Sequence, residues 1–251
     1  MKYLIQDSLY KEFHEERLIH ALDRMGLEYE MFSLQYFVDD IEVKTDRTDV
    51  MVFGAVKAAH LAKKYKWNPG SFYNENHDYT VYSKYYKENM LNWDSKIQKA
   101  SDPIDIDGPF FARPTGDTKL FKGKAYENVE EWNNDASYFL TNNPNSKDEL
   151  IQVAPLQNIL QEIRCFIVKG KVITASMYKL GNVVLYKECM DNDIIEYANN
   201  MASVYQPADA FVMDICRTAN GLKIVECNCI NCAGFYDIDM QKLIVSLEDN
   251  F

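Results

Sequence analysis

The chain has 251 residues, of which 47% are apolar and 13% aromatic. That composition is enough to bury a hydrophobic core without disulfides or structural metals. The formal net charge of −11 repels polyanions and argues against a nucleic-acid partner. No apolar run approaches the roughly 20 residues of a membrane span, and Asp7 interrupts the apolar start too early for a signal peptide. We therefore expect a folded, cytoplasmic protein with no membrane partner.

Six cysteines occur, all after residue 164, and we expect them to be reduced. Several sit inside apolar runs, where a thiol behaves as a small hydrophobe. Cys227, Cys229 and Cys232 are close enough in sequence to suggest zinc, which takes four ligands. All four histidines lie far upstream, so the fourth ligand is missing. Structural thiols are the better interpretation of this cluster, and zinc is the alternative.

The first 75 residues alternate between strand and helix patterns. Leu18, Leu22 and Met25 recur at helical spacing, and Gly26 follows them as a stop signal. We expect strands at residues 2–6, 28–34 and 49–54, and helices at residues 11–25 and 56–65. This order predicts a small α/β lobe over residues 1–78.

A second segment starts near residue 79, and from residue 110 onward strands dominate. Strands are expected at residues 110–113, 150–153, 164–168, 172–177, 211–215 and 222–226, and helices at residues 82–93, 129–140 and 193–204. Turn residues gather at 103–109 and 142–147. We assign residues 79–251 to a second unit, and the whole chain to the α/β class in its α+β form.

Residues 211–228 carry the most informative pattern in the chain. Two apolar strands flank the turn sequence at residues 219–221, which predicts a hairpin. A three-residue loop would place Asp214 directly opposite Glu226, with Asn228 on the same face. A two-residue Asn-Gly turn would put the two carboxylates on opposite faces. A joint site on this hairpin therefore requires the longer loop.

Two carboxylates and an amide oxygen on one face form a set of hard oxygen ligands, which suits Mg²⁺. A solvated polar face is the alternative interpretation. Asp214 and Glu226 each interrupt an apolar run, however, and an unpaired carboxylate is costly there. Cations stand at the ends of other predicted strands or just beyond them, at Arg113, Lys119, Arg164 and Lys179. Each alone is an ordinary surface charge, but together they would neutralise a triphosphate.

The order of these motifs resembles that of the ATP-grasp superfamily of ATP-dependent carboxylate ligases. The resemblance runs through residues 80–238, and residues 1–75 match the α/β lobe that usually comes before. It implies a pre-grasp lobe followed by two α+β lobes that clasp ATP. One departure is Arg113-Pro114, where better-known members carry Lys-Pro. This departure resembles a branch found in phages and bacteria, which would place a phage-encoded protein in the host cytoplasm.

The resemblance also implies residue roles. Nucleotide contacts are expected from Lys84, Arg113, Lys119 and Arg164, and from the backbone of Gln152, Val153 and Ala154 in a hinge beside adenine. Catalytic cations are expected at Lys119, Arg164 (in the pattern Glu162-x-Arg164) and Lys179. Metal ligands are expected at Asp214, Glu226 and Asn228, followed by a small-residue loop over residues 231–236.

The activity implied by this resemblance is ATP-dependent ligation. A substrate carboxylate would attack the γ-phosphate of ATP, with two Mg²⁺ ions bound, to give an acyl phosphate. An amine, or less often a thiol, would then displace phosphate. The substrates would be small-molecule or peptide acids and amines, and related ligases often form homodimers. The alternatives are a nucleotide-binding adaptor or inhibitor of a protein partner, and a phosphotransferase.

Overall fold

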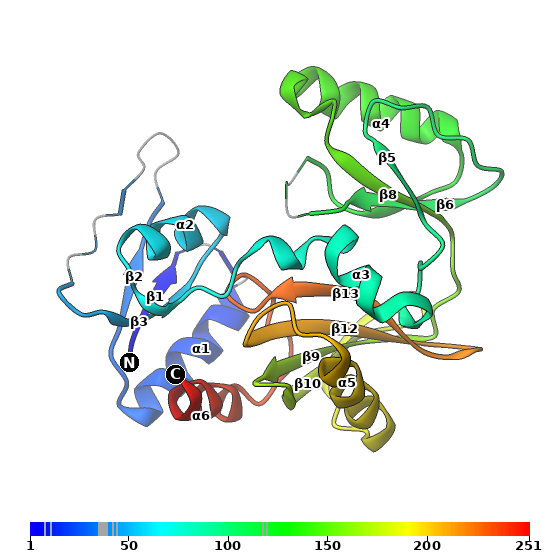
Figure 1. The fold of residues 1–251 in the computed structure, drawn as a ribbon. Helices are drawn as coiled ribbons and strands as arrows, with labels where there is room; N and C mark the ends of the chain where they lie inside the picture. The colour runs from blue at the N-terminus through cyan, green and yellow to red at the C-terminus, as the bar shows by residue number, and fades with distance from the viewer. Residues whose placement is uncertain are drawn as a thin grey trace.

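A computed structural model describes residues 1–7, 9, 10, 12–34, 40, 41, 43, 45–116, 118 and 120–251 (Figure 1). Within those residues lie three sheets and six α-helices. One sheet is parallel and the other two are antiparallel, which confirms the expected α/β protein of the α+β form. No described helix combines the length and the apolar character needed to cross a bilayer.

The N-terminal sheet is parallel, with the strand order β2-β1-β3-β4. Its strands are β1 (Lys2–Gln6), β2 (Tyr29–Phe32), β3 (Asp49–Phe53) and β4 (Asn68–Gly70), and its helices are α1 (Glu12–Met25) and α2 (Val56–Lys64). The elements expected in this segment are confirmed, but β4 was not expected. Its sequence, Asn-Pro-Gly, is typical of a turn, and pairing with the start of β3 makes it a strand.

The hydrophobic core of this lobe continues into the C-terminal part of the chain. Tyr3 and Phe53 pack in one cluster with Phe166 and with residues of α6 (Met240–Asn250), a helix that was not expected. Glu248 of α6 also accepts hydrogen bonds from the Tyr3 hydroxyl at 2.6 Å and from the N-terminal ammonium at 2.9 Å. Residues 1–78 therefore share their core with residues far beyond position 78.

The connection after the first lobe contains α3 (Tyr79–Tyr86) between two short 3₁₀ helices, η1 (Glu75–His77) and η2 (Lys87–Asn89). The helix expected at residues 82–93 therefore starts earlier and ends at Tyr86. Lys87 has a φ of 49°, which ends the helix. The amide of Leu91 then donates to the carbonyl oxygen of Ile224 at 2.8 Å, which draws this segment to the edge of a sheet.

The small lobe comprises residues 96–155 and has a core of its own. Its sheet has the order β5-β8-β6-β7, and Figure 1 shows it standing apart with α4 from the rest of the molecule. Trp132 is buried against Phe121, Tyr126 and Phe139. The elements are β5 (Lys96–Lys99), β6 (Phe110–Pro114), β7 (Lys124–Tyr126), α4 (Val129–Asn142), η3 (Pro144–Ser146) and β8 (Leu150–Pro155), of which β5 and β7 were too short to be expected.

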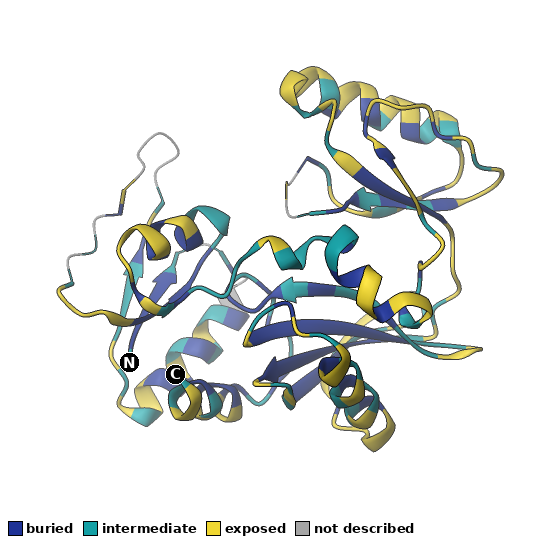
Figure 2. Cartoon of the chain, in the orientation of Figure 1, coloured by how far each residue is buried: buried dark blue, intermediate teal, exposed yellow. Residues whose placement is uncertain are grey.

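The third sheet is antiparallel and five-stranded, with the order β11-β10-β9-β12-β13. Its elements are β9 (Gln161–Val168), β10 (Lys171–Leu180), β11 (Val183–Glu188), α5 (Asn192–Val204), β12 (Ala210–Thr218) and β13 (Gly221–Cys229). Figure 2 shows β12 buried along most of its length, because both faces are covered. The edge strand β11 was not expected, and its Val183 and Val184 are exposed.

The β12–β13 hairpin reaches the predicted pairing by a different route. Asp214 lies opposite Glu226, as expected, but the turn has two residues, 219–220. The register shifts between Asp214 and Ile215, because Val225 is an extra residue in β13. This β-bulge brings Glu226 back onto the face of Asp214. The prediction that the site requires a three-residue loop was therefore wrong.

Candidate functional site

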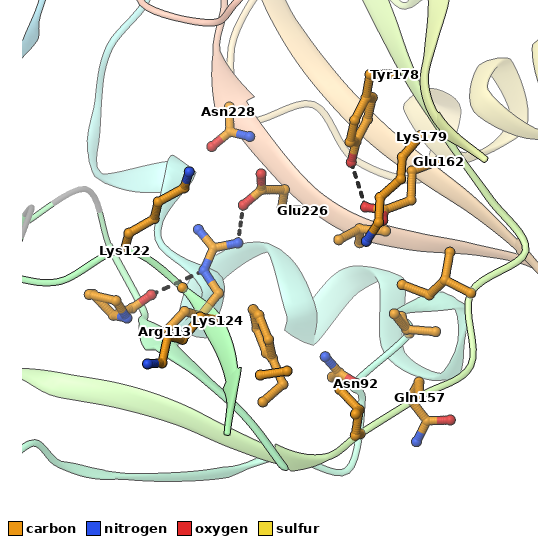
Figure 3. Close-up of a pocket in the computed structure, with 18 of the residues that line it drawn as sticks. Asn92, Arg113, Lys122, Lys124, Gln157, Glu162, Tyr178, Lys179, Glu226 and Asn228 are labelled. Carbon is orange, nitrogen blue, oxygen red and sulfur yellow. Dashed lines mark hydrogen bonds and ion pairs between the residues drawn. The ribbon is translucent and has the colours of Figure 1, made fainter. Parts of the chain in front are cut away.

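A cavity of about 1040 Å³ lies between the small lobe and the five-stranded sheet. One wall is formed by β6, the start of β7 and the loop between them, and the other by β13 and the ends of β9 and β10. The β8–β9 connection lines one end, and the segment before α3 lines the other (Figure 1). Figure 3 shows polar side chains pointing into this space from both lobes.

The three expected metal ligands come together on the β12–β13 hairpin. Glu226 and Asn228 line the cavity, and Asp214 is 1% exposed opposite Glu226. No three His, Cys, Asp or Glu side chains in the described part of the chain cluster closely enough to hold a metal. The third donor would therefore be the amide oxygen of Asn228. Two carboxylates and an amide are oxygen donors of the kind that Mg²⁺ takes, so the residues fit this ion.

Arg164 binds Asp214 in a buried, two-pronged ion pair. Its Nε donates to Oδ1 at 2.8 Å and its Nη2 to Oδ2 at 2.7 Å. Nη1 donates to the carbonyl oxygen of Gly234 at 3.2 Å, and the guanidinium lies 4.8 Å from the ring centre of Tyr236. The expected phosphate contact of Arg164 stays a prediction, because here this side chain orients Asp214.

Arg113 connects the two walls of the cavity. It extends from β6, and its Nη1 pairs with the carboxylate of Glu226 on β13 (Figure 3). Its Nε donates to the carbonyl oxygen of Pro114 at 3.3 Å. The side chains of Arg113 and Glu226 are 20% and 21% exposed, so the pair borders the open part of the cavity.

The two guanidinium groups influence the ionisation of the two carboxylates. Burial raises the pKa of Asp214 to about 6, against the opposing effect of Arg164. Burial also raises the pKa of Glu226, but Arg113 and Arg164 outweigh it and the pKa falls to about 2. Both carboxylates are therefore ionised at neutral pH, which is the form that binds a cation.

Lys179 and Glu162 form a further ion pair in the cavity wall. The ammonium of Lys179 lies 2.8 Å from Oε1 of Glu162, and the hydroxyl of Tyr178 donates to Oε2 at 2.8 Å (Figure 3). Pairing of β9 with β10 sets Lys179 opposite Glu162. Lys179 thus lines the cavity, and its catalytic role stays a prediction.

The loop between β6 and β7 contributes Lys122, which the sequence pattern did not single out. Figure 3 shows Lys122 pointing into the space that Arg113 and Glu226 also face. Lys124, two residues on, forms ion pairs with acidic residues of α4. Lys119 lies outside the described residues. Three lysines within six residues do not reveal from sequence which one faces inward.

Two groups of expected nucleotide contacts lie away from the cavity wall. Lys84 is exposed on α3. Gln152, Val153 and Ala154 are buried in β8, between β5 and β6, and the side chain of Gln152 donates to Ser95 Oγ at 2.8 Å. The cavity is lined instead by the next residues, 156–159. Strand β8 extends to Pro155, which moves the connection between the lobes further along the chain.

The other end of the cavity is lined by Tyr73 and His77, which no sequence motif had indicated, and by Cys232 of the cysteine cluster. Nδ1 of His77 donates to the carbonyl oxygen of Asn74 at 3.3 Å, because a carbonyl oxygen only accepts. Its Nε2 is buried and has no hydrogen-bond partner within the described residues. Burial lowers the pKa of His77 to about 4, so the ring is neutral at pH 7.

The six cysteines are free thiols, as expected. Cys227 belongs to the core on the far face of the sheet, where its sulfur lies 4.0 Å from the Tyr86 hydroxyl. Cys229 and Cys232 line the cavity instead. The three thiols thus do not converge, and the zinc alternative finds no support among the residues that the structure describes.

Solved structures share this arrangement of lobes. D-alanine–D-alanine ligase from Bacillus anthracis, complexed with ATP, has a TM-score of 0.67 at 13% identity, over 100% of this chain and 96% of that chain. D-cycloserine synthetase DcsG has a TM-score of 0.64 at 10% identity, over 99% of this chain and 98% of that chain. The ATP-grasp ligase PsnB, complexed with a phosphomimetic variant of its minimal precursor, Mg and ADP, has a TM-score of 0.57 at 13% identity. The match covers 99% of this chain and 98% of that chain. The fold is therefore the ATP-grasp fold.

The amino-acid sequence places the chain within that class. It matches the family described as ATP-grasp domain, R2K clade family 3, over residues 34–247. The protein belongs to this family, which confirms the expected membership of the ATP-grasp superfamily. No curated protein matches the sequence.

Proposed function

We propose that the protein is an ATP-dependent ligase that activates a carboxylate as an acyl phosphate and joins it to an amine. One observation carries this proposal: oxygen ligands of the hairpin and cations of both lobes face the same cavity. Glu226 and Asn228 stand on one side, and Arg113, Lys122 and Lys179 complete the lining. Positive side chains and a metal ion together spread the charge of a transferring phosphoryl group.

In this proposal, ATP lies with its adenine toward residues 156–159 and its phosphates toward the hairpin. Asp214, Glu226 and Asn228 would hold Mg²⁺, and two such ions would balance the four negative charges of ATP. The ion supplies electrostatic stabilisation of the phosphoryl oxygens. Arg113 and Lys122 bind the phosphates from the small lobe. The dependence on ATP also fits the cytoplasmic location that we propose.

The chemistry proceeds in two steps. A carboxylate oxygen of the first substrate attacks the γ-phosphorus, and ADP leaves as the bond to its β-phosphate breaks. The nitrogen of a neutral amine then attacks the acyl carbon, the bond to phosphate breaks, and the amine proton leaves with the phosphate. The cavity is large enough to hold a second molecule beside a nucleotide, and its uncharged end at Tyr73, His77 and Cys232 would receive the amine.

Trapping of the acyl phosphate tests this function without knowledge of the amine. Purified protein is incubated with ATP, Mg²⁺ and hydroxylamine, and with one acid at a time from a panel of amino acids, dicarboxylic acids and short peptides. We expect hydroxamate and ADP in equal amounts for at least one acid, and neither product from Glu226→Gln. Arg47→Gln, which alters an exposed ion pair of the N-terminal lobe, is the control. Binding of ATP without hydroxamate from any acid would favour the adaptor alternative.

A further inference from the structure

Each carboxylate of the candidate metal site is paired with an arginine. Arg164 holds both oxygens of Asp214, and Arg113 holds Glu226. Nη2 of Arg164 also lies 4.0 Å from Glu226. Two guanidinium groups and two carboxylates make this cluster formally neutral. A divalent cation entering it alone would have to displace an arginine or add two uncompensated positive charges, which is costly in a partly buried site.

The two arginines are held to different degrees. Arg164 is 9% exposed, makes two hydrogen bonds to Asp214 and one to Gly234, and lies over the Tyr236 ring. Arg113 is 20% exposed and, among the described residues, bonds besides Glu226 only to the carbonyl oxygen of the adjacent Pro114. Loss of the Glu226 contact would leave its guanidinium at the cavity wall. Phosphate oxygens there would accept the hydrogen bonds that Glu226 gives up.

We propose that Arg113 closes the metal site until a nucleotide arrives. Without nucleotide, Arg113 occupies the Glu226 carboxylate and competes with a divalent cation for it. The phosphates of ATP draw Arg113 away, and Glu226 then becomes available to the cation. The inference rests on the proposed nucleotide site and concerns the order in which that site fills. Nucleotide and metal therefore strengthen each other's binding by the same factor.

The pair also has a mechanical consequence. Arg113 belongs to the small lobe and Glu226 to the five-stranded sheet, so the ion pair links the two walls of the cavity directly. Transfer of Arg113 to the phosphates replaces this direct link by one that runs through the nucleotide. The two lobes thus remain connected both without and with bound nucleotide, but Glu226 is free only when nucleotide is bound.

Titration with Mn²⁺, followed by electron paramagnetic resonance of the free ion, tests this inference without a turnover assay. Mn²⁺ prefers the same oxygen ligands as Mg²⁺. Without nucleotide, Arg113→Gln should bind Mn²⁺ roughly tenfold more tightly than the wild type, because the substitution releases Glu226. Adding Glu226→Gln to Arg113→Gln should remove the gain. The control Arg47→Gln changes an exposed ion pair with Asp49 and should behave like the wild type.

The outcomes separate this inference from the proposed function. Equal Mn²⁺ affinity of the wild type and Arg113→Gln without nucleotide would overturn the role of Arg113. Failure of ADP to promote Mn²⁺ binding to the wild type, beyond the Mn²⁺ that ADP takes up in solution, would also overturn it. Failure of ADP to bind the protein at all would instead contradict the nucleotide site itself. If circular dichroism shows that Arg113→Gln is unfolded, Arg113→Lys replaces it. A lysine cannot reproduce the guanidinium contact, so a smaller gain is expected, and no gain would again overturn the inference.

Discussion

At the residue level, the centre of the site is held in place by one pair of side chains, the buried Arg164–Asp214 ion pair. Asp214→Asn would leave the Arg164 guanidinium buried with a weaker partner. We expect the free energy of unfolding to fall by about 3 kcal/mol, as when one partner of a buried ion pair is lost. Urea unfolding of Asp214→Asn, of Arg164→Met and of the double variant measures the coupling. Losses that simply add in the double variant would contradict a tight pair.

His77 makes stability depend on pH. Its pKa is 6.5 in the unfolded chain and about 4 in the folded protein, so between these values mainly the unfolded chain takes up a proton. Stability is therefore lost as the pH falls from about 6.5 to 4, by about 3 kcal/mol. His77→Asn keeps a donor for Asn74 but does not titrate. Between pH 7 and pH 4.5, the free energy of unfolding should fall more in the wild type than in His77→Asn. Parallel pH profiles of the two proteins would argue against a neutral, buried ring.

Sequence patterns located the site residues that interrupt apolar strands. Asp214 and Glu226 could be predicted because a carboxylate in such a run requires a partner or a ligand. Lys122 and His77 could not, since both lie in loop or turn segments whose path depends on tertiary contacts. The pairing of Arg113 with Glu226 was also out of reach, because it joins two lobes that are far apart in sequence.

At the scale of elements, α4 and the small-lobe sheet form a separate cluster around Trp132. Trp132→Ala should therefore destabilise this lobe by about 4 kcal/mol while leaving the five-stranded sheet intact. Hydrogen exchange measures this directly: amides of β6 and β8 should lose protection, and those of β9 and β12 should keep it. A uniform loss of protection along the chain would show that the lobes unfold together.

Most strands of the N-terminal sheet and of the five-stranded sheet could be predicted from their apolar runs. The details of the β12–β13 hairpin could not. A β-bulge at Val225 leaves no mark in composition or periodicity, because any residue can take the extra position. The short strands β5 and β7 could not be predicted from sequence for a related reason. Three or four residues show no alternation, and pairing with β8 and β6 is what orders them.

At the scale of the whole molecule, α6 joins the two ends of the chain in one core. Leu247 is fully buried in the cluster that contains Tyr3, Phe53 and Phe166. Leu247→Ala should cost about 3 kcal/mol and, unlike Trp132→Ala, should lower the protection of β1 and β9 together. Hydrogen exchange of the two variants, compared at the same temperature, checks this contrast. A loss of hydrogen-exchange protection confined to β1 would mean that the N-terminal lobe unfolds independently.

The fold class and the superfamily could be predicted because the order of the motifs along this chain resembles that of the ATP-grasp superfamily. The shared core could not, since α6 carries no motif and its role depends on contacts with α1 and β1. Residues 156–159 line the cavity in place of the expected hinge residues 152–154, because β8 runs on to Pro155. Composition and periodicity thus predict the longer elements with clear patterns, and long-range packing decides which short elements form and how all of them meet.

In the proposed site, ATP binding depends on Mg²⁺ and on the β12–β13 hairpin. Calorimetric titration of ATP into the purified protein, with and without Mg²⁺, measures both dependences. We predict binding in the micromolar range that requires Mg²⁺ and that Glu226→Gln weakens at least roughly tenfold. No binding under either condition, or binding that neither Mg²⁺ nor Glu226→Gln affects, would rule out this nucleotide site.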